Sequence, residues 1–515
     1  MTCPLSVDAD LIAALRHDLE AADYRVGHLA QVLGEMAVAA LERENGLPAL
    51  LAARRSDDRA ALVARLLTFG EALAADAVDR ALPALGIDGA IRLGLLRRVP
   101  DGRLRAAIDL RPVDIEGTAW WLASDLDSST TDRPVQADHV LGLGGASRTL
   151  AELTIRTPVT RALDLGTGSG IQALTLAGHS AAVVATDVSE RALAFTAFNA
   201  ALNGIDLQLR AGSMLQPVAG EQFDLVVSNP PFVITPRSGP LQTYTYRDGG
   251  RRGDDLVADL IRGVGDVLVP GGVAQLLGNW EIGADGDWAE RVRGWLVDSG
   301  LHGWVIQREV LDPAHYVETW LRDGGIAIER DPAAWRAAAL SWLADFDARA
   351  VGGVGFGYVI LRKPTRAEDP LRHRLEELTG PLGPALGSQI EHALAMAEFL
   401  AETDDAVLAD LTPEVAPDVT EERHLRPGAG DPEVILLRQG GGLRRVVRAG
   451  TWLAAVVGAC DGELTLGQIT AAVALLLDDD PVELRAGVYP QLRELLVDGL
   501  LTLSPAPGLD PIGHR

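Results

Sequence analysis

The chain has 515 residues, 47% of them hydrophobic and 23% charged, which is the composition of a globular protein long enough for two to four domains. Its formal net charge of −26 repels phosphate backbones at long range, although a local basic cleft could still bind nucleic acid. No apolar run could span a membrane and no signal peptide is recognised. Two distant cysteines, Cys3 and Cys460, do not suggest a disulfide framework, so a cytoplasmic location is expected.

The first part of the chain, residues 1–118, is expected to form a helical domain. Residues 7–45 show helical periodicity. Further helices are predicted at 60–69, 71–82 and 87–96. Two short strands are predicted within 95–110, around a Pro-Asp-Gly-Arg turn. Helices followed by a hairpin resemble a winged-helix module that docks a substrate, but a helical cap on the next domain is the simpler interpretation.

The central domain is expected at 119–364. It opens with adjacent tryptophans, Trp120 and Trp121, which we assign to packing, and continues with a polar linker at 124–138. A glycine cluster within 138–150 then precedes a predicted helix, of which Ser147 could be the N-cap.

A strand, a glycine turn and a helix are predicted over 161–177. The strand carries one acid, Asp164, and glycines follow at alternate positions, Gly166, Gly168 and Gly170. Because glycine lacks a Cβ atom, such a turn can bend tightly and approach a ligand. The next apolar run ends at Asp187, 21 residues after Gly166, where an acid could hydrogen-bond a ribose diol. The GxGxG spacing of the glycines disfavours a dinucleotide as the ligand. A nucleoside triphosphate is also disfavoured, because the turn lacks the GxxxxGK[ST] pattern.

A third strand, predicted at 223–227, leads directly into Ser-Asn-Pro-Pro-Phe at 228–232. Two prolines cannot continue a central strand, so this turn is expected at the carboxyl edge of the sheet, where open α/β sheets bind ligands. The amide oxygen of Asn229 and the carbonyl of Pro230 could each accept one N–H of a planar NH2 group, while Phe232 offers a flat face. A plain proline-containing loop is the alternative.

The two motifs together resemble those of class I S-adenosylmethionine (SAM) methyltransferases of the Asn-Pro-Pro-Phe/Tyr group. This group includes protein-glutamine methyltransferases of release factors and methyltransferases of exocyclic base amines in RNA. The resemblance covers 160–280 closely and 281–363 loosely. It implies an α/β fold, a doubly wound, seven-stranded, Rossmann-like core with SAM as the cofactor.

The resemblance also implies roles for particular residues. The cofactor-binding set would be Asp164, Gly166, Thr167, Gly168, Gly170, Asp187, Val188, Ser213, Met214 and Asn229. The acceptor clamp would be Asn229, Pro230, Pro231 and Phe232. The turn that binds the adenine amine usually ends in Asp, so Ser213 would make a weaker contact. A further loop would lie over the methionine end of SAM, formed by Gly144, Gly145, Ala146 and Ser147.

Beyond the clamp, residues 233–255 are polar and glycine-rich and are expected to line the substrate mouth. Their basic side chains are Arg247, Arg251 and Arg252, and a solvated loop is the alternative interpretation. Helices are predicted at 255–268 and 287–298, strands at 273–277, 303–308 and 355–361, and a helical insertion at 309–350.

The last part, 365–515, is expected to be an acidic, helical, winged-helix-like domain. Residues 365–435 are acidic and interrupted by prolines. Helices are predicted at 449–459, 466–477 and 481–498, and a strand at 500–503. Packing alone is again the alternative to a recognition role.

The sequence therefore predicts a SAM-dependent N-methyltransferase, with a protein glutamine side chain as the preferred acceptor. An exocyclic amine of an RNA or DNA base is the second hypothesis, and a non-catalytic SAM-binding scaffold is the third. The expected partner is a macromolecular acceptor, protein or RNA. No membrane association is expected. The ten histidines show no metal-ligand spacing, so no metal is expected.

Overall fold

A computed structural model describes residues 5–126, 136–237, 243–284 and 286–504. The chain divides into two compact units. The first contains Met1–Ala151 and Val159–Glu377, and the second contains Glu152–Pro158 and Leu378–Arg515. The seven residues 152–158 thus leave the first unit and belong to the second, where Thr157 Oγ1 bonds Glu391 Oε1. The predicted domain boundaries at 118 and 364 stay predictions.

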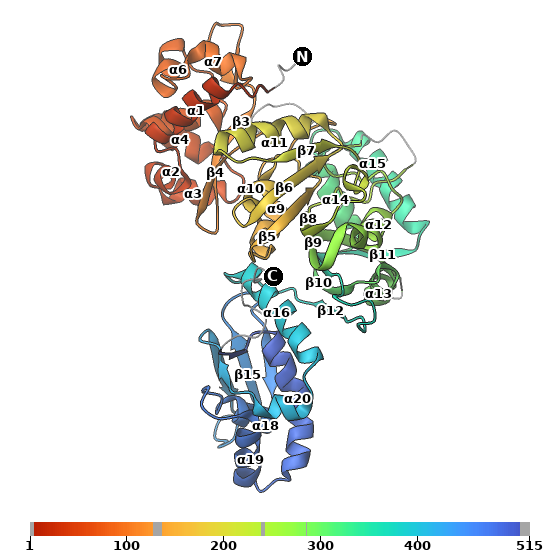
Figure 1. Cartoon of the computed structure of the whole chain (residues 1–515). Coiled ribbons are helices and arrows are strands. Elements are labelled where there is room, and N and C mark those ends of the chain that lie inside the picture. The colour runs from red at the N-terminus through yellow and green to blue at the C-terminus, as the bar shows by residue number, and fades with distance from the viewer. Residues whose placement is uncertain (1–4, 127–135, 238–242, 285, 505–515) are drawn as a thin grey trace. The chain divides into compact units, whose positions relative to one another are not determined.

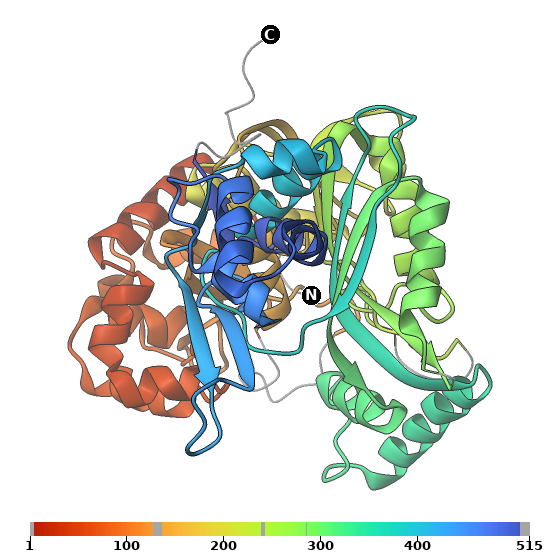
Figure 2. The ribbon, with the colours of Figure 1, turned by 90° about the horizontal axis from the view of Figure 1, so that it is seen from below.

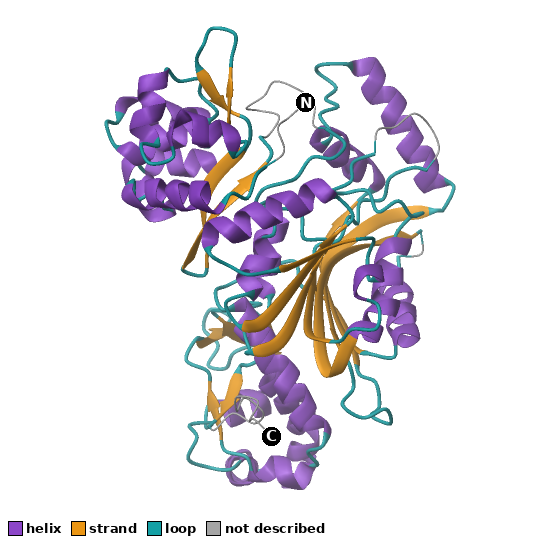
Figure 3. Ribbon diagram, turned by 45° about the horizontal axis from the view of Figure 1, so that its top comes forward, coloured by secondary structure: helices purple, strands orange, loops and turns teal. Residues whose placement is uncertain are grey.

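An eight-stranded sheet forms the centre of the first unit, in the order β12-β10-β11-β9-β8-β5-β6-β7 (Figures 1 and 3). Its strands are β5 (Val159–Leu165), β6 (Ser180–Asp187), β7 (Gln208–Ala211), β8 (Phe223–Ser228), β9 (Leu268–Gly283), β10 (His302–Leu311), β11 (Val351–Arg362) and β12 (His373–Glu377). Only β11 runs antiparallel to its neighbours. The doubly wound α/β fold is confirmed, and β12 adds an eighth strand at one edge to the seven that were predicted.

Helices cover both faces of this sheet because its central strands are buried on both sides. The helices that follow the strands are α10 (Ile171–Leu176), α11 (Glu190–Asn203), α12 (Asp255–Gly263) and α13 (Trp288–Ser299). Ser189 caps α11 through Ala192 N, and Gly204 ends this helix in a left-handed conformation. One core cluster joins α12 and α13 to the inner strands.

The amino-terminal helices share a core with the sheet domain. They are α1 (Ala9–Ala21), α2 (Val26–Leu33), α3 (Glu35–Leu41), α4 (Leu47–Arg55), α5 (Arg59–Leu67), α6 (Ala75–Ala81) and α7 (Gly86–Arg92). Their buried side chains form one cluster with Phe195, Phe198 and Leu202 of α11. This packing supports the interpretation of the helices as a cap on the sheet domain.

Two hairpins follow the amino-terminal helices. The first, β1 (Leu96–Arg98) with β2 (Leu104–Ala106), was predicted. The second was not, and it pairs β3 (Asp109–Ile115) with β4 (Thr118–Ser124), the strand that carries Trp120 and Trp121. Asparagines of α11 hold β4: Asn199 Oδ1 accepts from Ala123 N at 2.7 Å and Asn203 Nδ2 donates to Trp121 O at 2.8 Å.

The predicted helical insertion between β10 and β11 consists of α14 (Pro313–Asp323) and α15 (Pro332–Asp347). Figure 2 shows these two teal helices beside the far end of the long β9–β11 ribbon. Their apolar faces form a separate small core that includes Tyr316, Trp342 and Phe346. The insertion therefore packs on the part of the sheet domain next to the predicted clamp, since Val233 and Ile234 belong to the same cluster.

The second unit combines helices with short strands. Its helices are α16 (Leu386–Ala401), α17 (Asp405–Asp410), α18 (Thr451–Val457), α19 (Leu466–Leu477) and α20 (Pro481–Val497). Its strands are β13 (Pro413–Val415), β14 (Val419–His424), β15 (Val434–Gln439), β16 (Val446–Ala449) and β17 (Leu501–Leu503). The structure thus adds elements to the acidic segment 365–435, for which the sequence predicted none.

Three further expectations concern the whole chain. Among the described residues, no helix combines the length and the apolar character needed to cross a bilayer. No cluster of His, Cys, Asp or Glu within the same residues is arranged to hold a metal ion. Cys460 is a buried free thiol, while Cys3 lies outside the described residues.

Candidate active site

A cavity of about 460 Å³ lies at the carboxyl ends of β5, β6 and β8. Its volume falls in the range of small-molecule sites, about 300–1,000 Å³. Most of the predicted site residues line it: Gly166, Thr167, Gly168, Asp187, Val188, Ser213, Met214, Asn229, Pro230 and Pro231. The sheet therefore brings the glycine turn and the Asn-Pro-Pro turn to one cavity, although they are some 60 residues apart in the sequence.

Asp187 joins two loops of the cavity wall. Its Oδ2 accepts the backbone N–H of Gly168 at 3.0 Å, and its Oδ1 accepts that of Ser189 at 2.8 Å. Burial raises the pKa of this carboxyl, and the two N–H groups oppose the shift. Because a charged carboxylate has room for more than one hydrogen bond per oxygen, Asp187 can also accept bonds from a ligand in the cavity.

Asp164 lies beneath the glycine turn and is not part of the cavity wall. Its Oδ2 accepts hydrogen bonds from Thr167 Oγ1 at 2.7 Å and from Ala173 N at 3.0 Å. Its Oδ1 is buried and has no hydrogen-bond partner among the described residues. Burial raises the pKa of Asp164 to about 7, against the effect of the two hydrogen bonds. The structure therefore gives this residue contacts to the turn and the start of α10, and none to the cavity.

Gly170 also lies outside the cavity wall, and its position explains why a glycine stands there. Its φ is +89°, and a Cβ atom would lie 2.9 Å from Thr196 Cγ2 and 3.2 Å from Thr196 Cα of α11. Gly166, with a φ of +75°, has open space where its Cβ would be. Gly170 is therefore required by both conformation and packing, and Gly166 by conformation alone.

Asn229 leaves the end of β8 and turns toward α9 (Gly145–Leu153). Its Nδ2 donates to Ser147 Oγ at 3.2 Å, so its Oδ1 is the amide atom not used in this contact. Ser147 lines the cavity, whereas Gly144, Gly145 and Ala146 do not. Since α9 begins at Gly145, Ser147 lies inside the helix and does not have the N-cap position that was considered for it.

Phe232 is the clamp residue that the structure does not bring to the cavity. Its half-buried ring packs against two core clusters and meets Phe356 edge-on, with 6.2 Å between the ring centroids. Its backbone forms an isolated bridge with Asp248. The ring predicted for stacking therefore packs between the sheet and the insertion and does not line the cavity.

Two tyrosines of the predicted mouth, Tyr244 and Tyr246, line the cavity and were not singled out from the sequence. Their hydroxyls donate to Gly324 O at 2.9 Å and to Asp323 Oδ2 at 2.7 Å, at the end of α14. Burial is the main cause that raises the pKa of both phenols. These bonds fix the mouth to the insertion.

Arg247 does not supply the basic mouth that was predicted. Its side chain is only 6% exposed, lies 2.5 Å from Asp323 Oδ2 and donates to Trp320 O at 2.8 Å. The guanidinium also lies over the ring of Tyr244, 4.4 Å from its centroid. Arg251 and Arg252 are exposed, and Arg251 is the one that lines the cavity.

A second strip of chain, 138–142, lines the cavity beside the tyrosines and includes His139. Thr245 N donates to Ala137 O at 2.8 Å, and the rings of His139 and Tyr246 meet edge-on at 6.0 Å. Residues distant in sequence thus form one continuous wall. A lone histidine beside a linker carries no pattern that would have identified His139 from the sequence.

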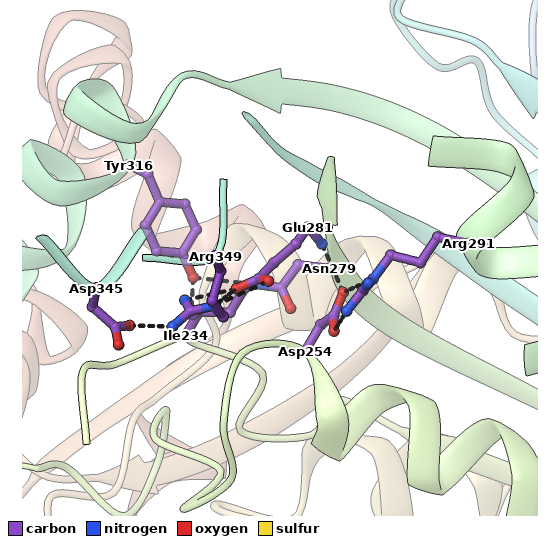
Figure 4. A network of polar contacts seen from close by, with 8 residues as sticks. All are labelled: Ile234, Asp254, Asn279, Glu281, Arg291, Tyr316, Asp345 and Arg349. Atoms are coloured by element: carbon purple, nitrogen blue, oxygen red, sulfur yellow. Dashed lines mark hydrogen bonds and ion pairs between the residues drawn. The ribbon is translucent and has the colours of Figure 1, made fainter. Parts of the chain in front are cut away.

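A polar network supports the chain immediately after the clamp (Figure 4). Tyr316 of α14 accepts hydrogen bonds from Ile234 N at 2.8 Å and Asn279 Nδ2 at 3.1 Å. Beside it, Glu281 pairs with Arg349 at 2.8 Å and buried Asp254 with Arg291 at 2.6 Å. The chain after the clamp is therefore held by Tyr316 of the insertion, which Asn279 of β9 contacts in turn.

Comparison with known proteins agrees with this geometry over the middle of the chain. Residues 142–285 match the family described as Methyltransferase small domain, and residues 21–107 match a domain of unknown function (DUF7059). The chain is 38% identical over 129 residues to the release factor glutamine methyltransferase of Deinococcus radiodurans, which is 24% of this chain and 46% of that protein.

It is also 38% identical over 187 residues to the ribosomal protein uL3 glutamine methyltransferase of Xanthomonas campestris pv. campestris, which is 33% of this chain and 55% of that protein. The chain thus spans about half the length of the curated relatives it matches. A solved methyltransferase from Pyrococcus furiosus matches with 17% identity and a TM-score of 0.26 over 42% of this chain and 82% of that one. The family and relative matches confirm the resemblance inferred from the two motifs.

Replacing Gly170 with alanine should destabilise the first unit more than replacing Gly166. Both substitutions place a Cβ at positive φ, which costs roughly 1–2 kcal/mol, but only Gly170→Ala also meets the backbone of α11. We expect Gly170→Ala to lose roughly 1–3 kcal/mol more than Gly166→Ala in denaturant unfolding. Equal losses would show that α11 does not restrict this turn.

Replacing Asp164 with asparagine should change how stability depends on pH. An acid whose pKa is raised from 3.8 to about 7 on folding makes the folded state less stable as pH rises between these values. Asparagine cannot ionise, so relative to wild type Asp164→Asn should gain roughly 1–3 kcal/mol between pH 4 and pH 8. Urea unfolding of the ligand-free variant and wild type at both pH values measures this difference. The cost of burying an amide does not depend on pH, so it cancels when the two pH values are compared. A pH-independent difference between the two proteins would contradict it.

Proposed function

We propose that this protein is a SAM-dependent N-methyltransferase that acts on a glutamine side chain of a protein. The observation that carries the proposal is that Asp187, the glycine turn and Asn229-Pro230 line one cavity at the carboxyl edge of the sheet. A cytoplasmic location and a macromolecular acceptor are part of the same proposal.

The residues of the cavity fit SAM. The carboxylate of Asp187 suits a ribose diol, and Gly166 and Gly168 of the turn leave their backbone open to the methionine part. Val188 and Met214 offer apolar surface to an adenine ring, and the Ser213 hydroxyl can accept a hydrogen bond from its amine. When bound there, SAM would supply a methyl group on a positively charged sulfur.

The acceptor would be positioned by Asn229 and Pro230. With Asn229 Nδ2 directed to Ser147, the Oδ1 atom can accept one N–H of a planar NH2 group, and the Pro230 carbonyl can accept the other. Two acceptors in one plane would orient the nitrogen lone pair away from themselves. Positioning of this kind supplies catalysis without a strong base, because the methylated nitrogen can lose its proton to water or a nearby carbonyl.

Two observations favour an amide over a nucleic-acid base. Phe232 does not line the cavity, where a base would need its ring for stacking. The net charge of −26 opposes the approach of a phosphate backbone. An exocyclic base amine remains a second candidate, supported by the tyrosine rings and by Arg251 in the cavity wall. The non-catalytic scaffold has only Ser213 in its support.

The proposal is tested by incubating the protein with a cell extract and SAM carrying a tritiated methyl group. We expect label in a species that protease destroys and nuclease does not, and methylglutamine after hydrolysis of that species. Label that nuclease removes would support the base amine instead, and no label above that of a heat-denatured control would support the scaffold.

Asp187→Ala should weaken SAM binding by about 1.5–3 kcal/mol, the value of hydrogen bonds to a charged group. Asp187→Asn is the matched control, because it keeps an oxygen for the turn and removes the charge; its loss should be smaller. Titration calorimetry measures both. Unchanged affinity in folded Asp187→Ala would contradict the assignment of this residue to SAM.

Asn229→Ala should separate binding from chemistry. SAM would be held mainly by the turn and Asp187, while Asn229 would align the acceptor, so SAM affinity should stay near that of wild type. Loss of one aligning hydrogen bond should slow single-turnover methyl transfer by about 10²–10³-fold. Ser147→Ala removes only the hydroxyl that meets Asn229 Nδ2, so we expect a smaller effect. Near-normal turnover of Asn229→Ala would contradict the clamp.

A further inference from the structure

An apolar patch on the second unit is exposed to solvent. It lies where α19 ends and α20 begins, and its most exposed members are Leu475 (84%), Leu476 (82%) and Val482 (70%). Leu466, Ile469 and Val473 of α19 are buried in the core of the unit, and Ile469 and Val473 also border the groove beside the patch. The end of this helix therefore presents leucines that the core does not bury.

The patch continues into a groove of about 240 Å³ beside α18 and α19. Apolar side chains line this groove, among them Ala455, Ala459, Leu464, Ala472, Leu476 and Leu477. The small alanines of both helices leave the space that the leucines border. The groove is therefore shaped to receive an apolar side chain from outside.

Acidic residues lie in the connections between the helices that form this apolar surface and in the first turn of α20. Between Ala449 and Leu484 the sequence has six acids and no Arg, Lys or His: Asp461, Glu463, Asp478, Asp479, Asp480 and Glu483. In the part of the chain that the structure describes, none of the six carboxylates forms an ion pair with a basic side chain. Arg485 also lies beside Val482, where its Nε donates to Pro481 O at 3.2 Å, so the charge at the rim of the patch is negative in excess, with six acids against this arginine.

We propose that this surface binds a protein segment whose apolar side chains are bordered by Lys or Arg. Burial of the leucines would supply affinity, and the acidic rim would select a cationic partner and speed its approach. The rim would repel RNA and anionic lipid, and a second copy of this chain would bring like charges together. The inference concerns recruitment of a partner, goes beyond methyl transfer and does not depend on it.

The test uses the full chain and two synthetic peptides of about 18 residues that form amphipathic helices. Both peptides carry leucine on one face, and the other face carries lysine in the first and glutamate in the second. We expect the lysine peptide to bind at least ~10-fold more tightly, and its binding to weaken as salt rises. Equal binding of the two peptides would overturn the proposal.

Two variants locate the binding. Leu475→Glu combined with Leu476→Glu should reduce lysine-peptide affinity at least ~10-fold, because two apolar contacts are lost and charge is placed on the apolar surface. The control is Leu340→Glu on α15, which is also exposed (61%) and should leave affinity unchanged. Thermal unfolding checks that each variant is folded. An equal loss in the control would mean that binding is not at the patch.

The charge requirement is tested by changing Asp478, Asp479 and Asp480 together to asparagine. Asparagine tolerates the left-handed conformation at position 478 and can cap α20 at position 480 as Asp480 does. At position 479 it keeps an oxygen that can accept the hydrogen bond from Trp452 Nε1, which Asp479 accepts at 2.7 Å. We expect several-fold weaker binding of the lysine peptide and a smaller effect of salt. Unchanged affinity and salt dependence would overturn the charge selection.

Other occupants are outcomes of the same experiment. Sedimentation of the wild-type chain reports self-association, and binding to an RNA oligonucleotide or to vesicles of anionic phospholipid is measured beside the peptides. We expect none of these interactions to depend on the patch. A dimer, an RNA complex or a vesicle complex that Leu475→Glu with Leu476→Glu abolishes would overturn the proposal in favour of that occupant.

Discussion

The hydrogen bonds between the Asp187 carboxylate and the backbone N–H groups of Gly168 and Ser189 connect the ends of two parallel strands. Through them, the turn after β5 and the turn after β6 take their shapes together. The same carboxylate faces the cavity, so the group that would bind a ribose also fixes the loop that would lie beside the rest of the cofactor. Beneath the turn, buried Asp164 holds Thr167 and the first turn of α10 from the other side.

The other half of the cavity depends on a different kind of support. The Asn-Pro-Pro turn has few hydrogen bonds of its own, because proline has no N–H to donate. Its position is set by side chains from outside: Tyr316 binds Ile234 N, and Phe232 packs on Phe356. Arg247 and the two tyrosines then join the mouth to the end of α14. The insertion between β10 and β11 is thus a structural part of the candidate acceptor site.

The sequence predicted those features that depend on local pattern. Glycine spacing, strand-length apolar runs and the proline pair were sufficient for β5, β6, β8 and the cavity at their ends. The features that were missed depend on distant partners. The β3–β4 hairpin is held by Asn199 and Asn203 of α11, and Arg247 is buried because Asp323 comes beside it. Phe232 lies away from the cavity, where its ring packs edge-on against that of Phe356. Neither periodicity nor spacing contains these pairings.

The short segment 152–158 has a consequence for how the protein is made. It leaves the ribosome before β5, yet the unit to which it belongs is completed only by residues 378–515. The partner of this segment, Glu391 of α16, is synthesised only after the whole sheet domain. Until then, the segment is connected to the chain on both sides and lacks this contact. A nascent chain or a truncated product that stops near residue 377 would present an unmatched strip immediately before the strand that leads to the glycine turn. Folding of the strip that precedes the candidate site therefore depends on completion of the carboxyl-terminal unit.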